Sequence, residues 1–509
     1  MKNIVKFVIP LILVIAIPLI LFVQKNENDL QKFDKITQSV FDEFHPTGLS
    51  MAIVKDGEII YQKALGYKNI HNVTFLDSYD IFNIASCTKA FTAAGIGKLV
   101  DDGLLSWNDK VIDYIPNFKL ADEHITKNLT LKDILSHRTG LGTFYGDLLW
   151  YNTTYTNDEV IDRMQYLPIS NDFRTEFGYQ NNMYMIAGKI IENVTGQSWE
   201  EYIQQTFLEP LEMSNSRTSS DRFNGTEEIA FPHYNDSLIG VYYFQATKPA
   251  ASIWSSPRDL ANWATMLLND GKWKNEQILT KETVRTLMSA QLALPVSEEN
   301  ESLGIHFRNY ALGWSTYDYN GRKIVEHNGG MPGFISKVAL IPEDNMAIII
   351  LNNGFELYGN NALFYSIVDI ATEQYKTNWI EYYSNKKIQS DQLEKEFNEN
   401  RITTKNTDIK PSFELNKYTG LFQDKMYGNA EIKIENDELI CTLLPAKKIF
   451  TSKLEHWSGD DFKLIFKDPF LPYGIIKFEI NELNIVTGFK IDLPSHDFHF
   501  KNLDFKKIN

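Results

Sequence analysis

The sequence predicts two folded domains, an α+β domain followed by a small all-β barrel or sandwich. A chain of 509 residues is too long to form one hydrophobic core. Strand-like segments occur near the beginning and near the end of the larger domain, with helical segments between them, so one sheet is expected to join its two ends. Beyond residue 411, short alternating segments recur at regular spacing, which is typical of a barrel or sandwich.

Local patterns place the main elements of the larger domain. Residues 48–67 alternate around an Asp-Gly pair, which indicates a β-hairpin. Residues 183–194 carry an apolar stripe at helical spacing that is closed by a glycine, which predicts an amphipathic helix. Strands at residues 310–314 and 323–326 are expected to flank an Asn-Gly pair as a second hairpin, and residues 338–341 are expected to pair with residues 347–351.

Changes of composition set the expected domain boundaries. Residues 1–29 carry lysines, a long apolar run and a polar end without a small-x-small cleavage site, which favours an uncleaved membrane anchor over a cleaved signal. The α+β domain is assigned to residues 30–378, a charged, Asn-rich linker to 379–410 and the β domain to 411–509. Since the positive flank would remain in the cytoplasm, the protein is expected to be extracytoplasmic, membrane-anchored or secreted.

Composition also excludes several classes of function. The formal net charge of −16 argues against a nucleic-acid partner. The two cysteines, Cys87 and Cys441, cannot form a disulfide framework, and Cys87 is expected to be a small buried residue. Neither His-Glu-x-x-His nor paired Cys/His spacing occurs, so no metal and no cofactor is expected. The oligomeric state cannot be predicted.

A hydroxyl and an amine stand three residues apart at Ser86 and Lys89. They precede an Ala-rich apolar run, residues 90–100, that predicts a buried helix. At this spacing both side chains lie on one face of the first turn, close enough to share a proton, and the helix N-terminus favours negative charge there. A second copy of the spacing, Ser384 and Lys387, lies in a charged stretch and is not expected to be catalytic.

Two later patterns complete the candidate site. Tyr179 and Asn181 form a Tyr-x-Asn pair in a Gly-bearing turn before the predicted helix at 183–194. His327 and Gly329 form a His-x-Gly pattern at the end of a predicted strand, and it is the only one among the ten histidines. Each pattern alone is more often a packing residue or a turn, so the assignment depends on all three occurring together.

In this order and spacing, the patterns resemble those of the class C β-lactamase and D-alanyl-D-alanine peptidase family, over about residues 35–378. Residues 131–141 and 249–260 are also similar to stretches of that family. The resemblance implies a β-lactamase/transpeptidase-like domain, with an antiparallel sheet flanked by helices and a helical subdomain. The last hundred or so residues resemble the lipocalin-like domain that follows such hydrolases in some members.

The resemblance also implies a role for each residue. Ser86 would attack an acyl carbon, and either Lys89 or Tyr179 would be its general base, a choice that the sequence leaves open. Asn181 would hydrogen-bond the substrate amide. The backbone N–H groups of Ser86 and Gly330 would hold the oxyanion.

His327, Gly329 and Gly330 are expected to line the substrate site. Class C β-lactamases usually carry lysine at the position of His327, whereas peptidases and esterases of the family often carry histidine. The implied function is therefore a peptidase or esterase acting on D-amino-acid peptides, peptidoglycan-type or small acyl substrates, with a class C-like β-lactamase as the alternative. A histidine with a pKa of about 6.5 would bind a substrate carboxylate mainly in acid.

A non-catalytic, membrane-anchored receptor on a hydrolase scaffold is the alternative from another class. The presence of Ser86, Lys89 and Tyr179 together argues against it. The expected partners are a small-molecule or peptide substrate and, through the N-terminal segment, a membrane.

Overall fold

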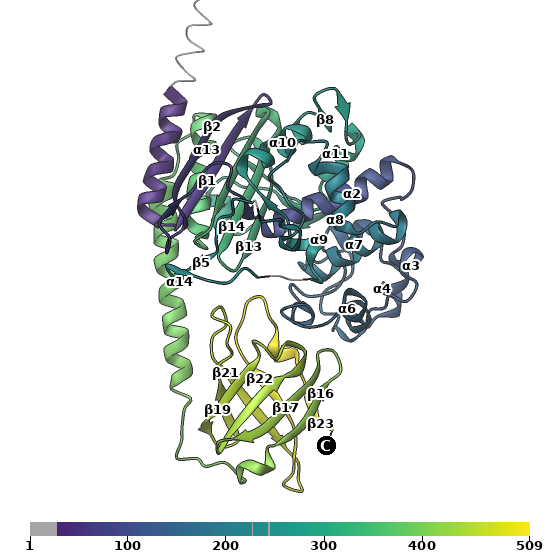
Figure 1. Ribbon diagram of the computed structural model, residues 1–509, viewed down its shortest axis with the longest axis vertical. Helices are drawn as coiled ribbons and strands as arrows, with labels where there is room; N and C mark the ends of the chain where they lie inside the picture. The colour runs from purple at the N-terminus through teal and green to yellow at the C-terminus, as the bar shows by residue number, and fades with distance from the viewer. Residues whose placement is uncertain (1–27, 226, 243–244, 509) are drawn as a thin grey trace, which may run out of the picture.

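The computed structural model describes residues 28–225, 227–242 and 245–508. A larger domain and a barrel lie end to end, and a long helix runs along one side of both (Figure 1). Almost all of the predicted membrane anchor, residues 1–29, lies outside the described residues. Within the described ranges, none of the helices has the length and apolar character that a membrane span requires.

The centre of the larger domain is a nine-stranded antiparallel sheet in the order β10-β11-β12-β13-β14-β15-β1-β2-β3. As predicted, the sheet joins the two ends of this domain, because β1 pairs with β15. Both predicted hairpins and the predicted pairing of residues 338–341 with 347–351 are present, but the first strand of the second hairpin is β12 at residues 315–319 rather than 310–314. The strands are β1 (Gly48–Lys55), β2 (Glu58–Asn69), β3 (Thr74–Phe75), β10 (Leu292–Leu294), β11 (Arg308–Tyr310), β12 (Ser315–Tyr319), β13 (Arg322–Met331), β14 (Phe334–Ile341) and β15 (Met346–Asn352).

Helices cover both faces of the sheet, so its central strands are buried on both sides. On β1, Met51 and Ile53 belong to a core shared with the helix at residues 28–44 and with α13 (Leu357–Thr372). The intervening Ala52 and Val54 face the opposite core. That core is shared with α2 (Thr88–Asp101), α7 (Asn181–Thr195) and α10 (Pro257–Leu268). The alternation of a strand therefore separates two hydrophobic cores.

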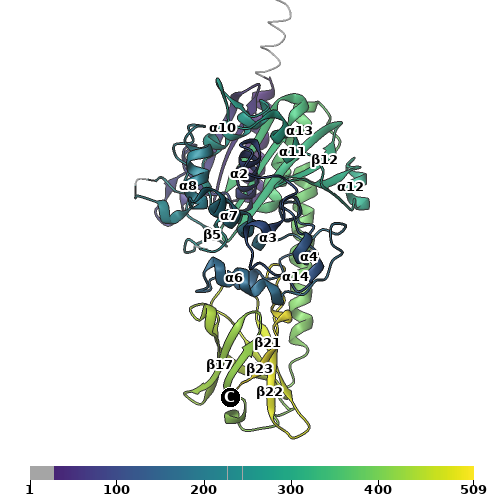
Figure 2. The same ribbon diagram turned by 90° about the vertical axis from the view of Figure 1, so that its right-hand side faces the viewer.

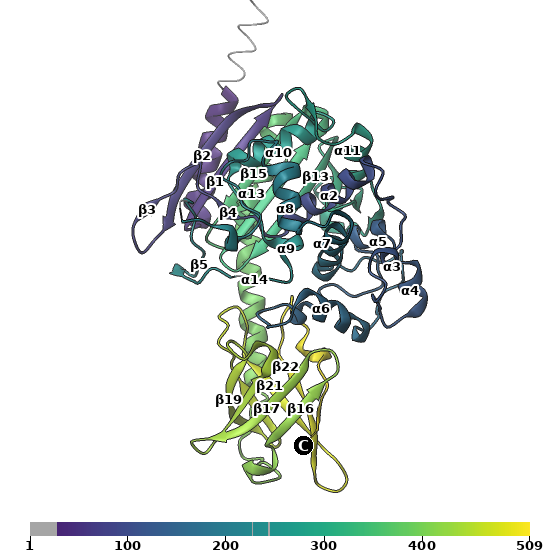
Figure 3. The same ribbon diagram turned by 45° about the vertical axis from the view of Figure 1, so that its right-hand side comes forward.

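A largely helical region extends from the face of the sheet that packs against α2, α7 and α10 (Figure 3). The predicted helix at 183–194 is α7, which ends at Gly196 in the left-handed conformation, with φ of 71°. The other helices are α3 (Val111–Tyr114), α4 (Glu123–Asn128), α5 (Leu131–Leu135), α6 (Asn157–Arg163), α8 (Trp199–Ile203), α9 (Lys248–Ala251), α11 (Lys281–Leu287) and α12 (Glu298–Ser302). Short strand pairs are β4 (Phe82–Asn83) with β7 (Trp254–Ser255), β5 (His233–Tyr234) with β6 (Ser237–Leu238), and β8 (Lys272–Trp273) with β9 (Glu276–Gln277).

The linker predicted at 379–410 is helical for most of its length, since α14 spans Trp379–Ile402. It leads to a closed antiparallel barrel of eight strands, which confirms the predicted all-β domain (Figure 2). The barrel strands are β16 (Gly420–Asp424), β17 (Gly428–Glu435), β18 (Glu438–Leu443), β19 (Thr451–Ser458), β20 (Asp461–Leu464), β21 (Gly474–Ile480), β22 (Val486–Asp492) and β23 (Phe505–Lys507).

Strand β13 meets the turn before α2 at Gly329, and the contact requires a glycine. A Cβ on Gly329 would lie 2.3 Å from the carbonyl oxygen of Ile84 and 2.2 Å from Oγ of Ser336. The Ser336 hydroxyl donates a hydrogen bond to that same carbonyl at 2.7 Å, so neither atom is free to move away. The neighbouring Gly330 is different, because its Cβ would meet only the side chain of Ile335, at 3.7 Å.

We therefore expect Gly329→Ala to destabilise the protein by about 1–3 kcal/mol, the usual cost of overpacking. The loss should appear as a lower Tm for unfolding of the larger domain. The matched variant Gly330→Ala should leave Tm almost unchanged, because its methyl group enters open space. Calorimetry of the two variants beside the parent tests the contact, and equal Tm values for both variants would contradict it.

Candidate active site

Ser86 lies at the entrance of α2, in the 3₁₀ turn Ala85–Cys87. Its side chain is half-exposed, whereas the residues on either side of it are buried. Ala85 has a φ of 46°, a left-handed conformation that is rare for alanine. Its N–H donates to Oδ1 of Asn83 at 2.7 Å, which helps to hold this strained turn. The fold therefore leaves Ser86 partly exposed in an otherwise buried turn.

Lys89 lies one turn farther on and is fully buried, with no exposed surface. Its amine is within hydrogen-bond distance of three oxygens: Oγ of Ser86 at 3.0 Å, Oδ1 of Asn181 at 2.7 Å and the carbonyl oxygen of Ala250 at 3.1 Å. Burial lowers the pKa of Lys89 to about 7, although the charge of Asp147 acts in the opposite direction.

The three oxygens can accept from an ammonium group, and they also suit the neutral amine that a pKa of about 7 makes available near neutral pH. A neutral amine has two hydrogens and one lone pair. The two hydrogens can go to the Asn181 side-chain oxygen and the Ala250 carbonyl, which only accept hydrogen bonds. The lone pair then faces Ser86, whose hydroxyl is the one partner that can donate. In its neutral form, the Lys89 amine is therefore a proton acceptor within hydrogen-bond distance of the candidate nucleophile.

Tyr179 lies beside Ser86 and Lys89. Its ring centre is 4.8 Å from Nζ of Lys89. Burial raises the pKa of Tyr179 far above its ordinary value, and a hydrogen bond with Ser86 offsets only part of that rise. Tyr179 is therefore a phenol, able to donate a proton, over the whole physiological range of pH.

Asp147 is a buried acid that the sequence patterns did not single out. Nδ2 of Asn181 donates to Oδ2 of Asp147 at 2.6 Å, and Nε1 of Trp150 donates to Oδ1 at 3.1 Å. Only 2% of the residue is exposed, and burial raises the pKa of its carboxyl to about 8. Asp147 is thus two hydrogen bonds away from Lys89.

His327 belongs to a buried chain of neutral groups. The backbone N–H of Gln180 donates to Nδ1 of His137 at 3.0 Å, so His137 carries its proton on Nε2, which lies 3.1 Å from the hydroxyl of Tyr310. That hydroxyl is 3.0 Å from Nε2 of His327, and Nδ1 of His327 is 2.6 Å from the carbonyl oxygen of Asn328. One assignment satisfies every contact, with Tyr310 donating to His327 and His327 donating to Asn328.

The expected titration of His327 near neutral pH is therefore wrong. Burial, aided by the charge of Lys89, lowers the pKa of His327 to about 3. Only 5% of the residue is exposed, and both ring nitrogens already have partners within the protein. His327 is therefore neutral and buried within β13. The adjacent Gly329 is buried against the nucleophile turn, and Gly330 is exposed.

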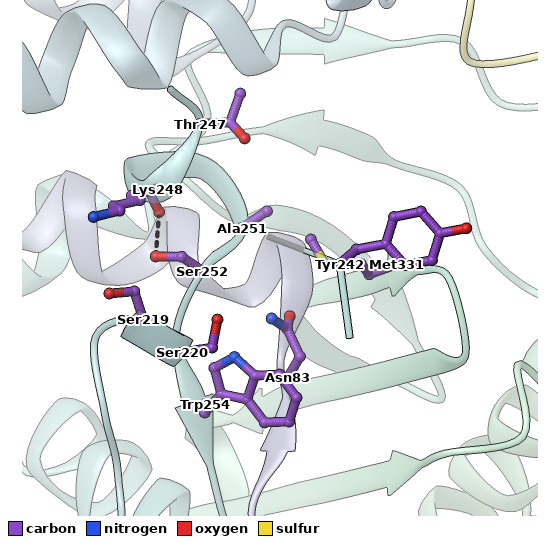
Figure 4. Close-up of a pocket in the computed structure, with 10 residues that line it drawn as sticks. All are labelled: Asn83, Ser219, Ser220, Tyr242, Thr247, Lys248, Ala251, Ser252, Trp254 and Met331. Carbon is purple, nitrogen blue, oxygen red and sulfur yellow. Dashed lines mark hydrogen bonds between the residues drawn. The ribbon is translucent and has the colours of Figure 1, made fainter. Parts of the chain in front are cut away.

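A pocket lies beside the nucleophile turn (Figure 4). Asn83, Ala251 and Met331 border it, and each adjoins a segment of the site: the nucleophile turn, the carbonyl that binds Lys89, and the end of β13. The other lining residues are Ser219, Ser220, Tyr242, Thr247, Lys248, Ser252 and Trp254. No group of three or more His, Cys, Asp or Glu side chains in the described part of the chain could hold a metal ion.

One loop of the barrel borders the site. Nε2 of His499 contacts the carbonyl oxygen of Thr143 at 2.8 Å. The ring of Phe144 lies between Tyr179, at 5.4 Å, and His496, at 5.7 Å. The charge of Asp497 helps to raise the pKa of Tyr179. The sequence contains no pattern that predicts this proximity.

The structure does not bring the second Ser-x-x-Lys copy into any such arrangement. Ser384 and Lys387 lie on α14. The hydroxyl of Ser384 donates to Glu43, and the amine of Lys387 pairs with Glu356 at 2.6 Å. Cys87, inside the first copy, is a buried free thiol that donates to the carbonyl oxygen of His327.

Comparison with known proteins assigns the two parts of the chain to different family models. Residues 33–369 match the model described as Beta-lactamase, and residues 404–507 match one described as Domain of unknown function (DUF3471). Among solved structures, that of the octameric penicillin-binding protein homologue from Pyrococcus abyssi aligns with a TM-score of 0.60 at 22% identity. The alignment covers 94% of this chain and all of that one, and it shows a shared fold.

Two curated relatives are also similar over much of their length. "Unguisins hydrolase ungD'" of Aspergillus campestris is 30% identical over 420 residues, which cover 78% of this chain and 76% of that protein. "Protein flp" of Staphylococcus aureus is 27% identical over 336 residues, which cover 64% of this chain and 63% of that protein.

The pKa of Lys89 yields a first prediction for the site. The rate at which a serine-directed probe labels Ser86 should rise as pH rises through about 7 and then level off, because only the neutral amine can take the Ser86 proton. Lys89→Arg should abolish labelling, since a guanidinium does not lose its proton in this range. A labelling rate that is independent of pH between about 5 and 9 would contradict this role.

The neutral state of His327 yields a second prediction. A substrate that carries a carboxylate and its methyl ester should show parallel profiles of kcat/KM between about pH 5.5 and 8, because His327 gains no charge there. The measurement compares the two substrates on the parent enzyme. A selective gain for the carboxylate substrate below about pH 6.5 would show that His327 becomes protonated and binds it.

Proposed function

The chain belongs to the Beta-lactamase family of serine hydrolases, and on this premise we propose that it cleaves amide or ester bonds through an acyl-enzyme formed on Ser86. The observation that carries the proposal is the buried amine of Lys89, which lies 3.0 Å from the Ser86 hydroxyl and has a pKa of about 7. A serine hydroxyl needs such a base to become a nucleophile.

In the first step, Lys89 takes the proton of Ser86, and Oγ of Ser86 bonds to the carbonyl carbon of the substrate. The resulting oxyanion would be held by the backbone N–H groups of Ser86 and Gly330. A donor of this kind is worth roughly 3 kcal/mol to the transition state. We assign the base to Lys89 rather than Tyr179, because burial makes the amine neutral and keeps the phenol protonated.

In the second step, the bond to the leaving group breaks, and the leaving nitrogen or oxygen needs a proton. Tyr179 is a phenol beside both Ser86 and Lys89, so it can supply that proton and recover one from Lys89. The acyl group then remains on Ser86 until water attacks the same carbon. Asn181 has one amide hydrogen committed to Asp147, which leaves the other for the substrate.

We propose a peptidase or esterase acting on D-amino-acid peptides, peptidoglycan-type or other small acyl substrates. A neutral His327 supplies no fixed positive charge for a penicillin carboxylate, which disfavours the alternative of a class C-like β-lactamase. A non-catalytic receptor would have no use for a neutral lysine directed at an accessible serine.

The test is covalent labelling with a fluorophosphonate, followed by mapping of the modified residue. Ser86→Ala should abolish labelling and reduce hydrolysis by about 10⁴- to 10⁶-fold, the usual effect of losing a nucleophile. Ser384→Ala is the matched control, because its hydroxyl pairs with Glu43 rather than with an amine, and it should label like the parent. A screen of D-amino-acid peptides, β-lactams and short esters then assigns the substrate class. Labelling that persists in Ser86→Ala would refute the proposal.

A further inference from the structure

The orientation of the Asn181 side chain decides whether Lys89 can act as a base. Its amide has an accepting oxygen at one end and a donating NH₂ group at the other. In the structure, Oδ1 faces Lys89 at 2.7 Å. If the amide were reversed, its NH₂ group would face the Lys89 amine, donor against donor. The amine would then lose one of its two acceptors, and its lone pair would no longer be directed at Ser86.

Asp147 excludes that reversed orientation. Its Oδ1 accepts from Nε1 of Trp150, a group that can only donate, and its Oδ2 accepts from the amide of Asn181. In its ionised form the carboxyl accepts at both oxygens, and the two hydrogen bonds and the charge of Lys89 favour that form against burial, which raises its pKa to about 8. Because the residue is almost completely buried, no solvent can replace either bond. Asn181 must therefore direct its NH₂ group at the ionised Asp147, and its oxygen then faces Lys89.

The barrel contacts the Asp147 segment on both sides of that residue. Four residues before it, the carbonyl oxygen of Thr143 receives the hydrogen bond from His499. Four residues after it, the hydroxyl of Tyr151 donates to Oδ2 of Asp468 at 2.5 Å. The ring of Tyr151 also lies against that of Phe498, at 4.1 Å. The barrel loops that make these contacts lie at its end nearest the larger domain (Figures 1 and 3).

We infer that Asp147 is a positioning residue for Lys89, acting through the amide of Asn181, and that the C-terminal barrel holds the segment bearing Asp147 in place. This inference rests on the function proposed above, because it concerns the same proton acceptor. It adds a structural role for the barrel in the reaction, although the barrel contributes no group that touches the reacting atoms.

The first experiment replaces Asp147 in the full-length protein. Asp147→Asn keeps the size of the side chain but has one acceptor and one donor, so it must oppose a donor with a donor at either Trp150 or Asn181. We expect kcat for an ester substrate to fall by about 10²-fold, the typical effect of a misplaced catalytic group, while KM changes less than about threefold. The labelling rate of Ser86 should fall in parallel with kcat.

The double variant Asp147→Asn, Trp150→Phe provides a rescue. Removing the Trp150 N–H lets the new amide direct its oxygen at Asn181, so at least about tenfold of the loss should return. Asp259→Asn is the matched control, because Asp259 is also buried and accepts from Ser216 and two backbone N–H groups, whereas the hydrogen bonds of Lys89 go to Ser86, Asn181 and Ala250. It should lower Tm without lowering kcat.

These results separate the two proposals. If the parent protein is not labelled at Ser86, the proposed function fails. If the parent is labelled and Asp147→Asn is labelled at the same rate, the function stands and the inference about Asp147 is overturned. A loss in Asp147→Asn that the double variant does not reduce would likewise overturn the orientation argument.

The second experiment compares two tyrosines at the interface with the barrel. Tyr151→Phe removes the hydrogen bond to Asp468 beside the Asp147 segment. Tyr155→Phe removes a hydrogen bond of similar length, 2.6 Å, to the carbonyl oxygen of Tyr427 farther along the chain. We expect kcat to fall about three- to tenfold in Tyr151→Phe, the usual value of one hydrogen bond, and to stay unchanged in Tyr155→Phe. Equal kcat values in the two variants would overturn the role given to the barrel.

Discussion

The burial of one lysine amine is the constraint on which the rest of the site depends. An ammonium group inside the protein loses its hydration, which favours the neutral amine unless the surroundings supply compensation. Here the partners of Lys89 come from three separate segments: Ser86 from the turn before α2, Asn181 from the start of α7, and the Ala250 carbonyl from α9. The site is therefore the place where these segments must meet with the correct spacing.

The two histidines near Lys89 are neutral, so neither adds a positive charge to the site. His137 and His327 are both buried, and the charge of Lys89 helps to lower the pKa of each. Their hydrogen-bond chain through Tyr310 satisfies the rings without any proton from solvent. At the position where class C β-lactamases carry a lysine, this protein thus has an uncharged histidine. The two side chains are similar in size, but the histidine removes a positive charge from the site.

The sequence predicts the features that depend on residues close together in the chain. The features that depend on contacts between distant segments become visible only in the folded structure. The spacing of Ser86 and Lys89, the helix α7 and the strand hairpins follow from local periodicity and turn residues, and the fold class follows from their order. The protonation state of His327 and the partner of Asn181 do not, because they depend on contacts between distant segments. Asp147 precedes Asn181 by 34 positions, and Asp468 follows Tyr151 by 317 positions. No local pattern relates residues so far apart, and even the expected linker proved to be a helix.

The barrel shows why a domain without catalytic groups can still belong to an active site. Contacts between domains within one chain are usually modest in area, so relative motion of the domains is the default expectation. In this protein the contacts at Thr143 and Tyr151 flank the buried acid that orients Asn181. Catalysis is sensitive to displacements of about 1 Å. A small interface is therefore sufficient to couple the barrel to the reaction, because it acts on the orientation of one amide rather than on the stability of the whole fold.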